Sequence, residues 1–99
     1  SIAPATANII GKAANGICDD LLSTTLCGCW NKPVLMAPAM NNNMWSNPRV
    51  QNNLEILRGI GFNTVGPEEG RLACGDNAVG RMSEPAEIVA MIKKMSSNI

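Results

Sequence analysis

The sequence of 99 residues contains no histidine, no tyrosine and a single phenylalanine. Histidine is the side chain whose ordinary pKa lies closest to neutral pH. Its absence leaves acid–base chemistry near pH 7 to carboxylates, cysteine or lysine. A mechanism that depends on histidine would therefore need a residue from another polypeptide.

Charge and long apolar runs are also scarce. Basic and acidic residues number 8 each, so the formal net charge is zero, and charged residues are 16% of the chain against about 25% in a typical domain. This balance does not favour nucleic acid or an anionic membrane as a partner. No apolar run approaches the roughly 20 residues needed to span a bilayer, and no signal-peptide pattern opens the chain. We therefore expect a soluble protein that acts in the cytoplasm.

The chain contains 4 cysteines. Cys27 and Cys29 form a C-x-C pair, which without histidine or a second close pair is a poor zinc signature, so we expect no metal site. In a reducing cytoplasm Cys18, Cys27 and Cys29 are expected to pack as small apolar residues. A redox or metal module built on Cys27 and Cys29 is a remote alternative.

Apolar periodicity and glycine or proline punctuation predict alternating strands and helices. Residues 1–4 have the composition of the end of a buried strand, and apolar residues spaced by three and four predict one helix over residues 6–26. The uniformly apolar run at residues 34–37 is typical of a strand buried on both faces. The elements expected further along are a helix capped by Asn47, a short strand at 62–65, a glycine-rich flap loop at 66–80, and a helix capped by Ser83.

This alternation predicts an α/β fold, as part of a Rossmann-like or flavodoxin-like three-layer parallel sheet. Two or three strands are too few to bury both the faces and the edges of such a sheet. We therefore expect residues 1–99 to be a portion of a single domain that an N-terminal half or a partner chain completes. An opening that has the composition of a strand, without a polar lead-in, is also expected of a fragment.

Two segments follow expected strands at their carboxyl ends, where open α/β sheets bind ligands. In IAPATAN, residues 2–8, backbone donors with Thr6 or Asn8 could hold a planar heterocycle or a phosphate, although an ordinary helix cap explains the segment equally well. In PAMNNNMW, residues 38–45, a neutral asparagine amide could donate to a substrate carboxylate beside the apolar walls of Met44 and Trp45. A turn with its hydrophobic side chains in the core is the alternative.

A third segment, ACGDNAVGRM at residues 73–82, lies inside the glycine-rich loop. Gly75 and Gly80 permit positive φ, and Cys74 is the thiol expected to be accessible to solvent and able to close over a site. Arg71 and Arg81 are near enough in sequence to serve a phosphate or to lower the pKa of that thiol. A single loop cysteine is most often inert, so this segment alone identifies no catalyst.

Together the three segments resemble the homo-oligomeric flavin-containing cysteine decarboxylases, over nearly the whole chain. The family's P-A-S-A-N-T segment is matched from Pro4, with Thr6 in the serine position and Ile9 in the threonine position. Its P-x-M-N-x-x-M-W motif is matched without deviation at residues 38–45. Its A-C-G-D-x-G-x-G-R-M flap is matched at residues 73–82, except that Ala78 replaces a glycine. The flap resembles the branch that acts on phosphopantothenoylcysteine.

The resemblance implies an FMN-dependent lyase that converts 4'-phospho-N-pantothenoylcysteine to 4'-phosphopantetheine in coenzyme A biosynthesis. In that scheme a hydride passes from the substrate cysteine to FMN, the resulting thioaldehyde loses carbon dioxide, and the ene-thiol formed is then reduced. The resemblance assigns Asn41 to the substrate carboxylate, Met44 to the pocket wall and Cys74 to proton donation. Arg81 is expected to bind substrate as well. The residues expected against the flavin and the subunit contact are Thr6, Ala7 and Asn8.

The chain departs from the family in lacking its flavin-phosphate loop and essential histidine, which lie in the family's N-terminal half. Sites in this family form between neighbouring subunits, so the resemblance implies a homo-oligomer, a trimer or a dodecamer, with the N-terminal half or a complementary chain supplying the missing parts. Two alternatives remain at this point. One is a peptide cysteine decarboxylase that acts on lantibiotic precursors, and the other is a non-catalytic regulatory subunit with the same fold.

Overall fold

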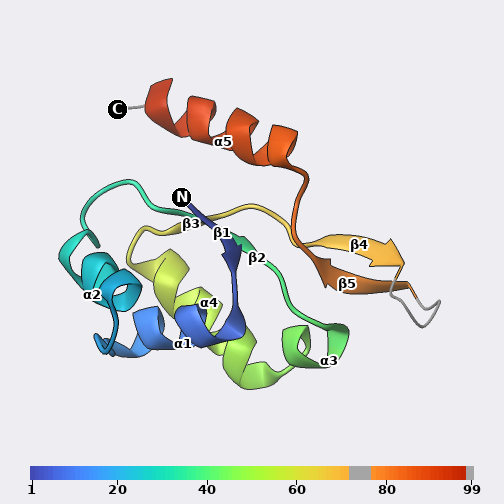
Figure 1. Ribbon diagram of the computed structural model, residues 1–99, viewed down its shortest axis with the longest axis horizontal. Helices are drawn as coiled ribbons and strands as arrows, with labels where there is room; N and C mark the ends of the chain where they lie inside the picture. Colours follow the sequence, from blue (N-terminus) through green and yellow to red (C-terminus); the bar gives the residue numbers. More distant parts are fainter. Residues whose placement is uncertain (72–76, 98–99) are drawn as a thin grey trace.

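The computed structural model describes residues 1–71 and 77–97. It contains a three-stranded parallel sheet, a two-stranded antiparallel hairpin and helices on both sides of the parallel sheet (Figure 1). In chain order the elements are β1 (Ile2–Ala5), α1 (Ala7–Asn15), α2 (Leu21–Gly28), β2 (Leu35–Pro38), α3 (Asn42–Trp45), α4 (Pro48–Gly59), β3 (Asn63–Thr64), β4 (Glu68–Arg71), β5 (Asn77–Arg81) and α5 (Pro85–Ser97).

The parallel sheet has the order β1-β2-β3, so β2 is its central strand. All residues of β2 are buried. Because side chains alternate along a strand, Met36 packs on one face of the sheet while Leu35 and Ala37 pack on the other. The predicted strand buried on both faces and the predicted α/β fold with a parallel sheet are thereby confirmed.

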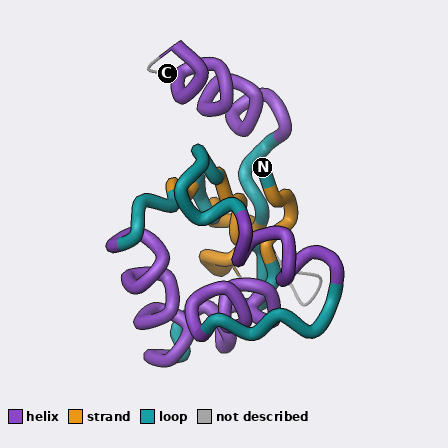
Figure 2. The backbone as a smooth tube through the Cα atoms, turned by 90° about the vertical axis from the view of Figure 1, so that its left-hand side faces the viewer, coloured by secondary structure: helices purple, strands orange, loops and turns teal. Residues whose placement is uncertain are grey.

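Helices cover the two faces and make three layers. On one face α1 and α4 pack together over a core that includes Ile10, Leu54 and Met36. On the opposite face lies α5 (Figures 1 and 2), where Ile88 packs against Leu35. In the part of the chain that the structure describes, no helix is long and apolar enough to cross a membrane.

The prediction of one continuous helix over residues 6–26 is wrong, because the chain forms two helices there. Gly16 ends α1 in a left-handed conformation with φ of 69°, which glycine adopts without a steric penalty. Asp20 then begins α2, and its carboxylate accepts from the backbone N–H and the hydroxyl of Ser23 at 2.8 and 2.7 Å. The apolar spacing runs through both helices, but these two caps divide them.

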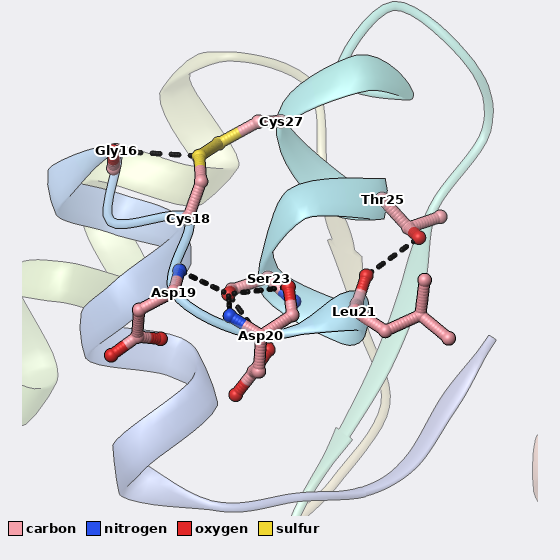
Figure 3. The surroundings of a disulfide bond; sticks show 8 residues. All are labelled: Gly16, Cys18, Asp19, Asp20, Leu21, Ser23, Thr25 and Cys27. Carbon is pink, nitrogen blue, oxygen red and sulfur yellow. Dashed lines mark hydrogen bonds between the residues drawn. A yellow bond between two sulfur atoms is a disulfide. The ribbon is translucent and has the colours of Figure 1, made fainter.

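Cys18 and Cys27 form a disulfide that ties the connection between α1 and α2 back to α2 (Figure 3). Both residues are exposed, whereas Cys29 is partly buried and free. The prediction of small apolar packing residues is therefore wrong for Cys18 and Cys27. The turn at Gly16 and Asp20 brings the two side chains together, a pairing that spacing alone does not reveal. Among the described residues, no group of three or more His, Cys, Asp or Glu side chains is placed to hold a metal ion.

The first strand forms as predicted, but most of it is not buried. Ala3 and Pro4 are exposed and Ile2 is partly buried, while Ala5 alone is fully buried. This exposure arises because β1 is an edge strand that pairs only with β2. Its outer edge therefore has no neighbouring strand among the described residues.

The glycine-rich segment is a hairpin where a loop was predicted. β4 and β5 pair in antiparallel fashion, with Glu68 opposite Arg81 and Arg71 opposite Asn77. Residues 72–76 of the predicted flap lie outside the described residues. Composition predicted a loop here because glycine disfavours strands, but backbone pairing between the two arms outweighs that preference.

Of the last two helices, the start of α4 was predicted correctly and the start of α5 was not. Asn47 caps α4 as predicted, since its side-chain oxygen accepts from the Arg49 N–H at 2.9 Å. The predicted cap of α5 by Ser83 is wrong: the Glu84 carbonyl accepts from the Ile88 N–H at 3.2 Å, so Glu84 holds the cap position. Ser83 is instead buried, and its hydroxyl has no hydrogen-bond partner among the described residues.

Candidate functional site

The first two polar segments lie side by side at the carboxyl edge of the parallel sheet. β1 and β2 are parallel with Ala5 opposite Pro38, and the Ala39 N–H donates to the Ala5 carbonyl at 3.1 Å. Thr6 follows β1 directly, and Asn41 follows β2 after a short turn. The structure therefore brings these two predicted segments together.

Asn41 is the N-cap of α3, and its side-chain amide is oriented by that role. Its Oδ1 accepts from the Met44 N–H at 2.8 Å. Only the oxygen of an amide can accept this bond, so the Nδ2 group is directed away from the helix as a donor. Within the described part of the chain Nδ2 has no partner, and the residue is exposed. The amide nitrogen of Asn41 is thus available to an acceptor on a ligand.

The two large apolar side chains of the segment divide between surface and core. Met44 is 43% exposed. Trp45 is partly buried and packs against the core on the α1 and α4 face. The interpretation of a turn with its hydrophobic side chains in the core therefore fits Trp45, while the pocket-lining role of Met44 stays a prediction.

Gln51 is a residue of this region that the sequence did not single out. It lies on α4, and its Nε2 donates to the carbonyl of Trp45 at 2.6 Å. No sequence signal identifies this bond, because the acceptor is a backbone carbonyl whose position depends on how α3 meets α4.

At the start of α1, at the same edge of the sheet, two backbone N–H groups have no hydrogen-bond partner among the described residues. Thr6 accepts from Ile9 N–H through its side chain at 3.3 Å and from Ile10 N–H through its carbonyl at 3.0 Å. The N–H groups of Ala7 and Asn8 belong to the first turn, where no intrahelical acceptor exists. An ordinary cap and an open position for an acceptor group are therefore both present here.

The hairpin reaches the same end of the molecule, since β5 contacts α3 (Figure 1). Arg81, the last residue of β5, is exposed, and its Nη1 lies 3.4 Å from Oε1 of Glu84. The guanidinium of Arg81 is thus paired with a carboxylate from the segment that leads into α5. Cys74 lies outside the described residues, and its place relative to Asn41 stays a prediction.

Comparison with curated proteins gives a consistent set of relatives. The coenzyme A biosynthesis bifunctional protein CoaBC of Bacillus subtilis (strain 168) is 50% identical over 93 residues, which are 94% of this chain and 23% of that protein. The phosphopantothenoylcysteine decarboxylase of Arabidopsis thaliana is 44% identical over 94 residues, which are 93% of this chain and 44% of that protein. The chain thus spans less than half the length of these curated relatives.

Solved structures of similar fold include a cysteine-to-serine mutant of PPC decarboxylase complexed with pantothenoylaminoethenethiol. It matches with a TM-score of 0.91 at 39% identity, over 97% of this chain and 53% of that chain. The FMN binding protein AtHal3 matches with a TM-score of 0.87 at 39% identity, over 99% and 54% of the two chains. The peptidyl-cysteine decarboxylase EpiD matches with a lower TM-score of 0.76 at 32% identity, over 89% and 52%.

A family model described as Flavoprotein matches residues 1–97, nearly the whole chain. This match agrees with the structural neighbours, whose folds align with nearly the whole of this chain at TM-scores of 0.91 and 0.87. The chain belongs to the flavoprotein family.

Proposed function

We propose that residues 1–99 are the C-terminal portion of a single flavoprotein decarboxylase domain. The completed domain uses FMN to convert 4'-phospho-N-pantothenoylcysteine to 4'-phosphopantetheine in coenzyme A biosynthesis in the cytoplasm. By completed domain we mean the full-length protein, or this chain joined by the complementary polypeptide that supplies the other half. The proposal follows the curated relatives, which are a coenzyme A biosynthesis bifunctional protein and a phosphopantothenoylcysteine decarboxylase.

The observation that carries the proposal is the orientation of Asn41. Its oxygen is held by the Met44 N–H at 2.8 Å, so its Nδ2 group is fixed as an outward donor. A neutral amide donor suits a substrate whose carboxylate must leave as neutral carbon dioxide, because it binds the anion without a full positive charge that would oppose departure. Met44, exposed beside it, supplies an apolar wall for the same substrate.

The segment Thr6–Asn8 fits a place against the flavin. The N–H groups of Ala7 and Asn8, which have no acceptor in the described part of the chain, lie beside the Asn41 segment because of the bond between Ala39 and Ala5. They can donate to the polar edge of a planar ring. When bound, FMN would supply the hydride-accepting redox chemistry of the reaction. The similarity to an FMN binding protein supports this cofactor.

Cys74 is the proposed proton donor in the final reduction, and Arg81 the proposed substrate-binding cation. Support for a late role of a cysteine comes from the solved structure of the PPC decarboxylase mutant, in which a cysteine is replaced by serine and pantothenoylaminoethenethiol is bound. An ene-thiol is the compound expected to accumulate if the last proton transfer is slow. Arg81 would exchange its partner Glu84 for a substrate phosphate, which it can bind in bidentate fashion.

The rest of the fold must come from polypeptide outside these residues. The sequence has no histidine, and the outer edge of β1 has no strand beside it among the described residues. On the α5 face an apolar cavity of about 440 Å³ remains, lined by Ser1, Pro33, Leu35, Ile92, Met95 and Ser96. Parallel sheets are normally covered on both faces. An N-terminal half or complementary chain would fill these places, and assembly into a trimer or dodecamer would complete the sites.

Native mass spectrometry and a substrate comparison test this proposal together. The purified completed domain is expected to carry FMN and to release carbon dioxide from 4'-phospho-N-pantothenoylcysteine, but not from a peptide that ends in cysteine. Turnover of the peptide in preference to the phosphopantothenoyl substrate would contradict the assignment. So would a completed domain that binds the substrate without turnover, which is the behaviour of a regulatory subunit.

A further inference from the structure

The helix that carries Asn41 is a single turn, and it is too short to be stable by itself. α3 consists of four residues, Asn42–Trp45. Isolated helices shorter than about 12 residues are marginal in water, and the last carbonyls of any helix have no intrahelical partner. The orientation of Asn41 therefore depends on contacts that hold this turn from outside.

One such contact comes from the next helix. Nε2 of Gln51 donates to the Trp45 carbonyl at 2.6 Å, and it is the only partner of that carbonyl in the described part of the chain. Gln51 is partly buried and lies in the first turn of α4, which the buried residues Leu54 and Leu57 fix against the core. The bond thus attaches a marginal turn to a well-packed helix.

A continuous set of hydrogen bonds leads from this attachment to the site. The Trp45 N–H donates to the Asn41 carbonyl at 2.9 Å, and the Met44 N–H donates to the Asn41 side-chain oxygen at 2.8 Å. If the Trp45 carbonyl is released, the turn can shift, and the Met44 N–H that orients the Asn41 amide shifts with it. The core does not require Gln51, because α4 is held by its own apolar side chains.

We infer that Gln51 is a positioning residue for recognition of the substrate carboxylate, acting through Trp45, Met44 and Asn41. This inference rests on the proposed role of Asn41. It assigns to α4 a part in the site although Gln51 itself does not touch the substrate.

The test compares Gln51→Ala with Asn52→Ala in the FMN-loaded completed domain. Asn52 is exposed on the same helix and its side chain makes no hydrogen bond among the described residues, so it controls for the loss of an amide from α4. Three quantities are measured: KM and kcat for 4'-phospho-N-pantothenoylcysteine, and the affinity for 4'-phosphopantetheine, which lacks the carboxylate. Gln51→Glu is the second variant, because it keeps the side-chain length but cannot donate when ionised.

Gln51→Ala and Gln51→Glu are each expected to raise KM about three- to tenfold, the effect of one lost hydrogen bond, with a smaller change in kcat. Affinity for 4'-phosphopantetheine and all constants of Asn52→Ala should stay at the wild-type values. In an Asn41→Asp background Gln51→Ala should add nothing further. Equal weakening of both ligands, or a wild-type KM in both Gln51 variants, would overturn the inference. Wild-type kinetics in Asn41→Asp alone would instead overturn the proposed function on which it rests.

Discussion

The side-chain amide of Asn41 has two polar groups that serve different purposes. Its oxygen caps α3 through the Met44 N–H at 2.8 Å, and its nitrogen is left to donate outward. Aspartate caps a helix about as well as asparagine, but it cannot donate when ionised. Folding and binding can therefore be separated at this one position.

Asn41→Asp should keep the stability of the completed domain and lose its activity. The carboxylate still accepts from Met44, but it brings a negative charge to the substrate carboxylate in place of a donor. We expect kcat/KM to fall at least about tenfold with an unchanged melting temperature. Asn41→Ala, which removes the cap as well, should also destabilise the protein by about 0.5–2 kcal/mol. Wild-type kinetics for Asn41→Asp would remove this residue from the site.

Cys74→Ser should stall the reaction after carbon dioxide has left. A serine hydroxyl is a far weaker acid than a thiol, whose ordinary pKa is about 8.5, so it should fail as the proton donor of the final reduction. In a single turnover of the completed domain we expect normal release of carbon dioxide and accumulation of the ene-thiol. Product mass and flavin absorbance are measured together to detect them. Saturated 4'-phosphopantetheine formed at the normal rate would exclude Cys74 as the donor.

At the scale of elements, the region where α1 leads into α2 contains charged groups whose pKa values are shifted by their neighbours. Lys12 lies 2.9 Å from Asp19 and 3.0 Å from Asp20, and hydrogen bonds to these carboxylates raise its pKa. Hydrogen bonds from the backbone N–H and the hydroxyl of Ser23, and to a smaller extent from Lys12, lower the pKa of Asp20 to about 2. Because the folded-state pKa lies below the ordinary value, the ionised form of Asp20 favours the folded protein.

Asp20 should therefore make the free energy of unfolding depend on pH in the acid range. Its contribution is complete above its ordinary pKa near 4 and is lost as the pH falls through about 2. Asp20→Asn keeps an N-cap but does not titrate. Thermal unfolding of the completed domain should show that wild type loses more stability than Asp20→Asn between pH 4 and pH 2. Parallel losses in the two proteins would show that the carboxylate is not ionised preferentially in the folded state.

The elements that were predicted correctly are those whose signal is local. The apolar run of β2 and the Asn47–Pro48 start of α4 follow from burial and capping within a few residues. The hairpin of β4 and β5 could not be predicted, because its two arms meet only through backbone pairing. The break at Gly16 was missed because apolar spacing continues beyond it.

The candidate site shows the same division. Thr6, Asn41 and Met44 were predicted as site residues from their sequence segments, and the structure places these segments at one edge of the sheet. Gln51 was missed, since its contact with Trp45 depends on the angle between two helices. The disulfide between Cys18 and Cys27 was missed because it depends on the turn between α1 and α2.

At the scale of the whole molecule, the fold presents surfaces that a complete α/β domain would cover. The outer edge of β1 is unpaired in the described part of the chain, and Val89 and Ile92 on α5 are 48% and 38% exposed. The chain spans 53% of the solved PPC decarboxylase chain. These observations support the proposal that further polypeptide completes the domain.

The measurement that tests this account most directly is carbon dioxide release from 4'-phospho-N-pantothenoylcysteine, by the completed FMN-loaded domain and by the isolated 99 residues at equal concentration. The account predicts turnover to saturated 4'-phosphopantetheine by the completed domain, and neither FMN retention nor turnover by the isolated chain, which has no histidine. Stoichiometric flavin or turnover in the isolated chain would contradict the dependence on a second half. A completed domain that binds FMN but releases no carbon dioxide would contradict the proposed activity itself.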